Sequence, residues 1–194
     1  MKKTVYYLSL LLLLVACVSA TDDNPAINET LNTIFSRKSV RTYTSKPLEE
    51  KQLDILVRAG MAAPSSRDIR PWEFVVITDK ALLEEMAEAL PLAAMLAHTQ
   101  QAIVVCGDSE KSENCWSLDC SAASQNILLA AESMGIGAVW TAAFPYPDRV
   151  EAVQRLLQLP AHIIPLNVIP LGYPGGDEEA VDKYDRARIH YNRF

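Results

Sequence analysis

A cluster of cations in an acidic chain is the first candidate for chemistry. The segment Arg37-Lys38-Ser39-Val40-Arg41 carries three cations and a hydroxyl, although the formal net charge of the chain is −6. Guanidinium groups bind phosphate through paired, planar hydrogen bonds. If the segment is extended, Arg37, Ser39 and Arg41 point to one side, because side chains alternate along a strand. The pattern predicts an anion site; the alternative is a helix ending near Phe35, whose negative end attracts the same cations.

Hydrophobic periodicity predicts helices and strands in alternation around this segment. Helices are expected over residues 27–35, from Lys46-Pro47 to Ala63, over 80–90 after an Asp79 N-cap, from Asp119 or Ser121 to Met134 before Gly135, and from Pro147 to about Leu159. Strands are expected over residues 72–78, 102–106, 138–141 and 163–171. Because the two kinds of element are interleaved, we expect one sheet covered by helices on both faces.

The composition is that of a globular protein with one sizeable core. Hydrophobic residues make up 49% of the 194 residues, and we find no internal repeat. The chain has 24 acidic and 18 basic residues, which argues against nucleic acid as a general partner. The polar tail, residues 177–194, carries aromatic side chains that need a surface, either in their own domain or on a partner subunit.

Residues 1–20 are typical of an export signal. Two lysines form a basic start, and the apolar stretch over residues 5–18 is shorter than the roughly 20 residues of a membrane-spanning helix. Its end, Leu14-Val15-Ala16-Cys17, resembles the lipobox of bacterial lipoproteins, in which the cysteine is acylated. Cleavage after Val18-Ser19-Ala20 by ordinary signal peptidase is the alternative. In both cases we expect an exported bacterial protein, either periplasmic or anchored to the membrane through a lipid on Cys17.

The other cysteines and the histidines offer little chemistry. Cys115 and Cys120 are close enough in sequence for a pairing to be considered in an exported protein, but spacing cannot decide geometry. The chain has no CxxC motif and three histidines, which argues against a metal site. We expect the thiols, including Cys106, to be structural or incidental, and His98 and His162 to lie at the surface or cap helices. We find no nucleophile paired with a base, so no catalytic side chain is predicted.

Several segments, in this order, carry a resemblance to a known family. They are Ser36-Arg37-Lys38-Ser39-Val40-Arg41, Ala63-Pro64-Ser65-Ser66-Arg67-Asp68-Ile69-Arg70-Pro71-Trp72, Gly135-Ile136-Gly137-Ala138-Val139-Trp140 and Leu171-Gly172-Tyr173-Pro174. With them, residues 27–194 resemble the nitroreductase family of FMN-dependent oxidoreductases. The resemblance implies one α+β FMN-binding domain, with a mixed, largely antiparallel central sheet flanked by helices on both faces. It also implies a homodimer with two FMN sites at its interface.

The resemblance also implies an activity. In such enzymes NAD(P)H reduces the flavin, and a nitroaromatic, quinone-like or related small acceptor then takes the electrons in a ping-pong cycle. Export raises an objection, because nicotinamide cofactors are not expected outside the cytoplasm. A reduced quinone, a flavoprotein partner or a small reductant is therefore an alternative donor.

Carried onto this sequence, the resemblance assigns contacts with FMN near both ends of the domain. The contacts with the phosphate and the isoalloxazine ring match Arg37, Lys38, Ser39 and Arg41. Among these, Arg41 is the candidate cation beside the ring, where negative charge builds up on reduction. A basic pair that reaches the same phosphate matches Arg186 and Arg188.

Two further stretches match contacts around the ring. A loop that the family brings to the flavin from the other subunit matches Pro64, Ser65 and Ser66. Asp68 stands where the family usually has asparagine, and an ionised carboxylate can only accept hydrogen bonds. A backbone stretch that lines one face of the ring matches Trp140, Thr141 and Ala142.

Two other functions remain open on the same residues. One is a flavin dehalogenase or ring oxidase on the same scaffold, whose candidate substrate lid is Asp108–Leu118 with Trp116 available to stack on an acceptor. The other is an exported lipoprotein that binds flavin as an electron-transfer component or carrier, or that only scaffolds a surface complex.

Overall fold

The computed structural model describes residues 28–194. The predicted export signal over residues 1–20, with Cys17, lies outside the described residues, as does Ile27 at the start of the predicted first helix. Within residues 28–194, every helix is too short or too polar to span a membrane.

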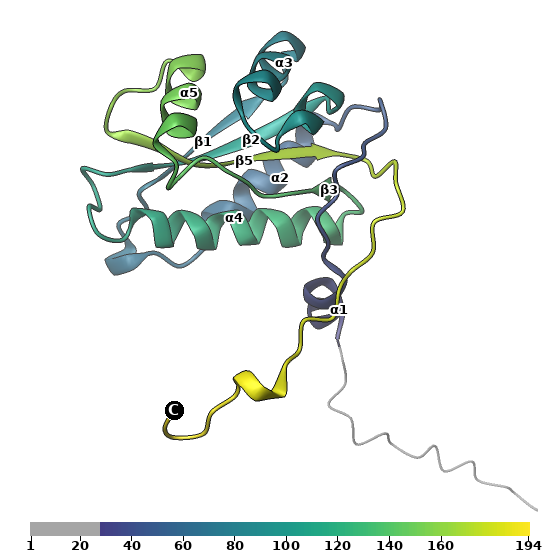
Figure 1. The fold of residues 1–194 in the computed structure, drawn as a ribbon, viewed down its shortest axis with the longest axis vertical. Coiled ribbons are helices and arrows are strands. Elements are labelled where there is room, and N and C mark those ends of the chain that lie inside the picture. The colour runs from purple at the N-terminus through teal and green to yellow at the C-terminus, as the bar shows by residue number, and fades with distance from the viewer. Residues whose placement is uncertain (1–27) are drawn as a thin grey trace, which may run out of the picture.

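Helices and strands alternate along the chain, as the periodicity predicts (Figure 1). The helices are α1 (Glu29–Ser36), α2 (Glu50–Met61), α3 (Lys80–Ala89), α4 (Trp116–Ser133) and α5 (Pro147–Leu157), with short 3-10 helices η1 (Ser66–Asp68), η2 (Ala94–His98) and η3 (Arg186–Arg188). The strands are β1 (Trp72–Ile77), β2 (Gln101–Asp108), β3 (Gly137–Ala138), β4 (Thr141–Ala142) and β5 (Ile163–Gly172).

The sheet has the order β1-β2-β5-β3, with β4 also paired to β5. The resemblance implies a mixed, largely antiparallel sheet. Each of the strand pairings described within residues 28–194 is antiparallel. Side chains of the central strand β2 alternate between two cores. Ala102, Val104 and Cys106 pack on the side of α3 and α5, whereas Ile103 and Val105 pack on the side of α2 and α4. The predicted sheet with helices on both faces is confirmed (Figure 1).

Local signals set most of the element boundaries. Asp79 caps α3, because its side chain accepts a hydrogen bond from the backbone N–H of Ala81. Gly135 follows α4 with a φ of +67°, the left-handed conformation that glycine adopts most easily after a helix. Both residues perform the tasks that the sequence predicts for them.

Most boundaries lie within two residues of the prediction, and three larger differences stand out. Helix α2 begins at Glu50 and not at Lys46-Pro47, because Glu49 forms a capping box with Gln52. Helix α4 begins at Trp116, before the predicted start at Asp119 or Ser121. The strand predicted over residues 138–141 is divided into β3 and β4, which both pair with β5.

Residues 48–172 form what we call the layered body, and two terminal arms extend from it: α1 and residues 179–194 (Figure 1). Helix α1 has no buried residue, and residues 179–194 are all exposed. The first arm joins the body where the N–H of Val40 donates to Ala138 O at 3.0 Å. Gly137 permits this contact, since a Cβ there would lie 2.6 Å from Cγ1 of Val40.

Candidate functional site

The anion-site segment, residues 37–41, connects α1 to the layered body. Val40 is buried, with 1% of its surface exposed, whereas Arg41 is exposed. The guanidinium groups of Arg37 and Arg41 form no ion pair with any residue in the described part of the chain. Arg37 also caps the C-terminal end of α1, which is where the alternative interpretation puts it. The two arginines are therefore free to bind an anion.

The charge of Lys38 is already paired within the chain. Its Nζ lies 3.1 Å from Oε1 of Glu132 near the end of α4, and both side chains are largely shielded from solvent. A partly buried partner at this distance neutralises the ammonium. Lys38 remains a predicted cofactor contact, but the structure gives it another task, which is to tie the anion-site segment to α4.

Glu178 fixes the backbone of the same segment from the other end of the chain. Its Oε1 accepts hydrogen bonds from the N–H groups of Arg41 at 2.9 Å and Thr42 at 3.0 Å. These bonds, with the one from Arg41 the largest cause, hold the pKa of the Glu178 carboxyl below its ordinary value despite some desolvation. A backbone bridge between Tyr43 and Pro174 continues the contact. The start of the tail therefore runs beside the anion-site segment.

Arg41 also lines a hollow of about 480 Å³, which we call the ring hollow. The backbone stretch that the resemblance assigns to one face of the flavin ring lines the same hollow: Trp140, Thr141 and Ala142. Thr141 is held firmly, because its hydroxyl donates to Val168 O at 2.6 Å. Two predicted contact regions, far apart in the sequence, are thus brought together.

Arg149 of α5 is a further cation of the ring hollow, and the sequence analysis did not find it. Its guanidinium carbon lies 3.9 Å from the centroid of the Tyr146 ring, and Nη1 donates to Ala142 O at 3.3 Å. Its Nε is buried and has no hydrogen-bond partner among the described residues. A single arginine on an amphipathic helix resembles any surface residue, so no sequence signal distinguishes it.

The predicted loop of Pro64, Ser65 and Ser66 is held by a buried carboxylate. Both carboxylate oxygens of Asp119, a residue 6% exposed, accept from the N–H of Ser66, at 3.1 and 3.2 Å. Oγ of Ser65 accepts from the N–H of Arg70 at 2.7 Å, which is the capping task expected of a turn serine. The prediction that Asp119 or Ser121 begins the helix is wrong: Asp119 lies in the first turn of α4 and anchors this loop.

Asp68 turns toward a neighbouring cation. Its Oδ1 accepts from Nε of Arg70 at 2.7 Å, and this hydrogen bond keeps the pKa of the Asp68 carboxyl below its ordinary value. Arg67, Asp68 and Arg70 all have positive φ, at 51°, 58° and 55°. Such backbone conformations are costly for residues other than glycine, and they gather at functional loops. The strain supports a role for the loop, although Asp68 itself is engaged by Arg70.

The Pro64–Ser66 loop and the anion-site segment lie at opposite ends of α4 (Figure 1). Asp119 holds the Pro64–Ser66 loop near the start of this helix, and Glu132 holds Lys38 near its end. The two anchoring residues are 13 positions apart (132 − 119), which corresponds to about 20 Å at 1.5 Å per residue. Within one chain, the loop and the anion-site segment are therefore separated by most of the length of α4.

Arg186 and Arg188 lie in the exposed tail and bond to their own neighbours. Nε of Arg188 is 3.2 Å from Oδ2 of Asp185, and Nη1 of Arg186 donates to Ile189 O at 3.1 Å. An earlier part of the tail, residues 180–184, shares a hollow of about 790 Å³ with Ile34, Phe35 and Arg37. The structure thus brings the tail to the anion-site segment, while the two arginines lie further along.

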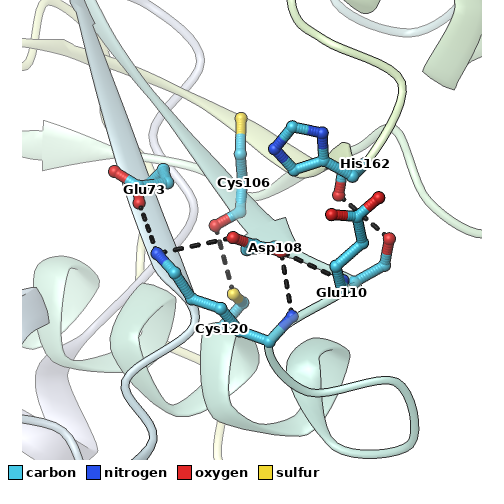
Figure 2. Close-up of polar contacts among 8 residues, drawn as sticks. Glu73, Cys106, Asp108, Glu110, Cys120 and His162 are labelled. Carbon is cyan, nitrogen blue, oxygen red and sulfur yellow. Dashed lines mark hydrogen bonds and ion pairs between the residues drawn. The ribbon is translucent and has the colours of Figure 1, made fainter.

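The segment considered as a substrate lid, Asp108–Leu118, begins with a hydrogen-bonded turn (Figure 2). Oδ1 of Asp108 accepts from the N–H groups of Glu110 and Lys111, both at 3.0 Å. Burial acts to raise the pKa of Asp108, but these hydrogen bonds outweigh it, so the pKa lies below its ordinary value. Trp116 is buried at the start of α4, where its ring packs edge-on against Phe144 with centroids 4.9 Å apart. Trp116 is thus a core residue and not an exposed stacking platform.

The cysteines of residues 28–194 are free thiols. Cys106 packs in the core beside α3, whereas Cys120 packs in the core on the α4 side of the sheet (Figure 2). Sγ of Cys120 donates to the carbonyl of Cys106 at 3.3 Å, and burial raises the pKa of both thiols to about 12. The pairing of Cys115 with Cys120 is absent, and no group of side chains in this range suits a metal ion. Cys106 and Cys120 are thus packing residues of the core.

Comparison with known proteins identifies relatives of the whole domain. The model of the nitroreductase family matches residues 34–114 and 89–173. A protein of Methanothermobacter thermautotrophicus, provisionally named an NADH dehydrogenase/NAD(P)H nitroreductase, is 45% identical over 168 residues, covering 86% of this chain and 88% of that protein.

Solved structures of similar fold belong to proteins with similar names. A crystal structure from Parabacteroides distasonis, with the same provisional name, is 63% identical with a TM-score of 0.85, covering 86% of this chain and 99% of that one. An FMN-dependent nitroreductase from Clostridium difficile is 27% identical with a TM-score of 0.80, covering 84% of this chain and 98% of that one. Because the family model spans most of the described residues and these relatives extend over the same domain, this chain belongs to the nitroreductase family.

Proposed function

We propose that this protein is an FMN-dependent oxidoreductase that passes electrons from NAD(P)H to nitroaromatic, quinone-like or related small acceptors. The observation that carries the proposal is the ring hollow, which Arg41 lines together with Trp140, Thr141 and Ala142. The names of the relatives support the cofactor and the donor, since one is an FMN-dependent nitroreductase and another is provisionally an NAD(P)H nitroreductase.

The side chains present suit FMN. A phosphate with close to two negative charges needs more than one donor group, and Arg37 and Ser39 supply these at the edge of the layered body. The ring hollow combines apolar and aromatic side chains with arginines, which suits a planar ring that is apolar on its faces and polar along its edge. When bound, FMN supplies the transfer of hydride and electrons, so no side chain of this protein needs to act as a nucleophile.

The protein has three tasks in this reaction. Arg37, Ser39 and the arginines of the tail hold the phosphate. The backbone of residues 140–142 orients the ring, and Arg41 keeps positive charge near the ring edge. One hollow offers one working face, so we expect the oxidised donor to leave before the acceptor binds, as in a ping-pong cycle.

We propose further that two copies of the chain complete each site. The Pro64–Ser66 loop and the anion-site segment are separated by most of α4, so a loop from a second copy is better placed to reach the ring. Apolar side chains exposed on the arms support the same association, among them Phe35, Tyr184, Tyr191 and Phe194.

Export of this protein is also a proposal, and it concerns residues outside the described range. If Cys17 is acylated, the wild-type protein will partition with the membrane fraction, and Cys17→Ala will release it or leave it unprocessed. Recovery of unprocessed, soluble wild-type protein from the cytoplasm would exclude export. An exported protein that NAD(P)H reduces only in vitro would direct the search for a donor to reduced quinones or a flavoprotein.

An absorption spectrum of the purified protein tests the proposed function most directly. We expect a yellow dimer that binds FMN and is bleached under anaerobic conditions by NADH or NADPH. A yellow protein that only dithionite bleaches would contradict the donor and favour a flavin carrier. A colourless protein that takes up no added FMN would remove the proposed function.

Paired substitutions test the assigned residues. We expect Arg37→Ala with Arg41→Ala to lose FMN while the circular dichroism spectrum is retained. The matched control is Arg58→Ala with Arg155→Ala, which removes the same charge from exposed helical positions on α2 and α5. Equal FMN affinity in both double variants would remove the site assignment.

A further inference from the structure

We propose that Arg149 is a second electrostatic determinant of the flavin, which acts with Arg41 to favour the reduced form of the ring. This inference rests on the proposed function, because it assumes that the flavin ring occupies the ring hollow. Arg149 lies outside the anion-site segment, the Pro64–Ser66 loop and the tail, to which the predicted charged contacts belong.

Arg149 is held rigidly at the wall of the ring hollow. It stands in the first turn of α5, where its guanidinium stacks on Tyr146 with 3.9 Å between the guanidinium carbon and the ring centroid. Nη1 donates to Ala142 O, which belongs to the backbone stretch expected to face the flavin ring. A guanidinium fixed by a stacked ring and a carbonyl keeps its position when a ligand enters, so its field is preorganised.

The charge of Arg149 is uncompensated in the described part of the chain. No carboxylate lies within ion-pair distance of its guanidinium among residues 28–194. Its Nε is buried without a hydrogen-bond partner in the same range. A partly buried charge without an opposite charge costs free energy, and negative charge that enters the hollow would offset that cost.

Negative charge in the hollow is the interaction that satisfies both arginines. The oxidised flavin ring is neutral, whereas the reduced ring carries negative charge along its N1 and O2 edge. A fixed cation therefore stabilises the reduced ring more than the oxidised ring, which raises the reduction potential. Two arginines that line one hollow make this effect larger than Arg41 alone would.

The test is the midpoint potential of FMN on purified, flavin-loaded protein, measured by equilibration with redox dyes. For Arg149→Gln we expect the affinity for reduced FMN, relative to oxidised FMN, to fall about tenfold, which corresponds to a potential lower by about 30 mV for a two-electron couple. The dissociation constant of oxidised FMN should change less than threefold. Arg149→Lys keeps the charge and should restore most of the potential.

Arg155→Gln is the matched control, because Arg155 lies on the same helix but is exposed and faces Glu85 and Glu88. Its potential should equal that of the wild type. If Arg149→Gln does not fold, Arg149→Met keeps the aliphatic stem and takes its place in the comparison.

Three outcomes would overturn the inference. The first is an unchanged potential in Arg149→Gln. The second is an Arg149→Lys potential as low as that of the neutral variant. The third is a raised KM for anionic acceptors without a change in potential, which would assign Arg149 to the acceptor. A wild-type protein that binds no FMN would instead remove the proposed function and this inference together.

Discussion

The layered body and the terminal arms use apolar residues in opposite ways. In the body, all eight residues of β2 are buried between two helical layers. In the arms no residue is buried, yet Phe35, Tyr184 and Phe194 expose 62%, 71% and 107% of their reference surface. A chain gains nothing from exposed aromatic side chains on its own, so the arms are suited to packing against another copy. The body supplies stability, and in our proposal the arms bring two copies together to complete a site.

Among the predicted changes, removal of the tail should have the largest effect on dimerisation and on FMN affinity. A chain that ends at Glu179 loses the arginines and the exposed aromatic residues of that arm, but it keeps every strand of the body. We expect a monomer with an unchanged circular dichroism spectrum, whose FMN affinity is lower by roughly 100-fold, about 2.7 kcal/mol. Light scattering and FMN titration would measure both. A truncated protein that remains dimeric and yellow would show that the tail is dispensable.

Gly137→Ala should disturb the junction between arm and body. Its Cβ would lie 2.6 Å from Cγ1 of Val40, so the anion-site segment must move. We expect a loss of up to about 3 kcal/mol in the free energy of unfolding, together with weaker FMN binding. Gly60→Ala, which crowds Ile127 and Phe74 inside the body, is the control and should leave FMN affinity unchanged. Equal FMN affinity in both variants would show that the anion-site segment does not bind FMN.

Asp119→Ala should loosen the Pro64–Ser66 loop while the body remains folded. The N–H of Ser66 loses its charged acceptor, which we expect to cost about 2 kcal/mol. Hydrogen exchange at Ser66 should accelerate, and the rate of FMN dissociation from the dimer should rise. Asp119→Asn keeps a neutral acceptor, so its rate of hydrogen exchange at Ser66 should lie between those of the wild type and Asp119→Ala. Unchanged exchange at Ser66 in the alanine variant would contradict the anchoring role.

Acid should weaken the contact between the tail and the body. The pKa of Glu178 is lowered in the folded protein, so its contribution is present above the ordinary value of 4.5 and is lost as pH falls through the folded value. We expect the melting temperature of the wild type to fall more steeply below about pH 4.5 than that of Glu178→Gln. Thermal unfolding at pH 3 to 7 measures this, and parallel curves for the two proteins would contradict it.

The thiols of the body should show the smallest effect. Burial raises the pKa of Cys106 and Cys120 to about 12, so both thiols stay protonated and unreactive at pH 8. We expect iodoacetamide to modify Cys115, which is partly exposed, well before the other two, with the fold unchanged. Peptide mass spectrometry reports each cysteine separately. A peptide linked through Cys106 and Cys120 would contradict the placement of their side chains on opposite faces of β2.

Features that depend on neighbouring residues follow directly from the amino-acid sequence. The apolar run of β2, the Asp79 cap and the Gly135 stop could all be predicted, because the period of two or 3.6 residues and capping chemistry act over a few positions. The burial of Val40 next to an exposed Arg41 is the alternation expected of an extended segment. The arrangement of one sheet between two layers of helices could also be predicted, because interleaved apolar strands and helices have few ways to bury their apolar faces.

Which distant residues meet depends on packing, and no local pattern predicts it. The bond between Asp119 and Ser66 spans 53 positions and that between Lys38 and Glu132 spans 94. Arg149 reaches the ring hollow because α5 packs on β5, the strand that pairs with β4. A carboxylate or a guanidinium looks the same in sequence whether it faces water or a buried partner. The physical reason is that its charge interacts over a few ångströms of space, and packing alone sets those distances.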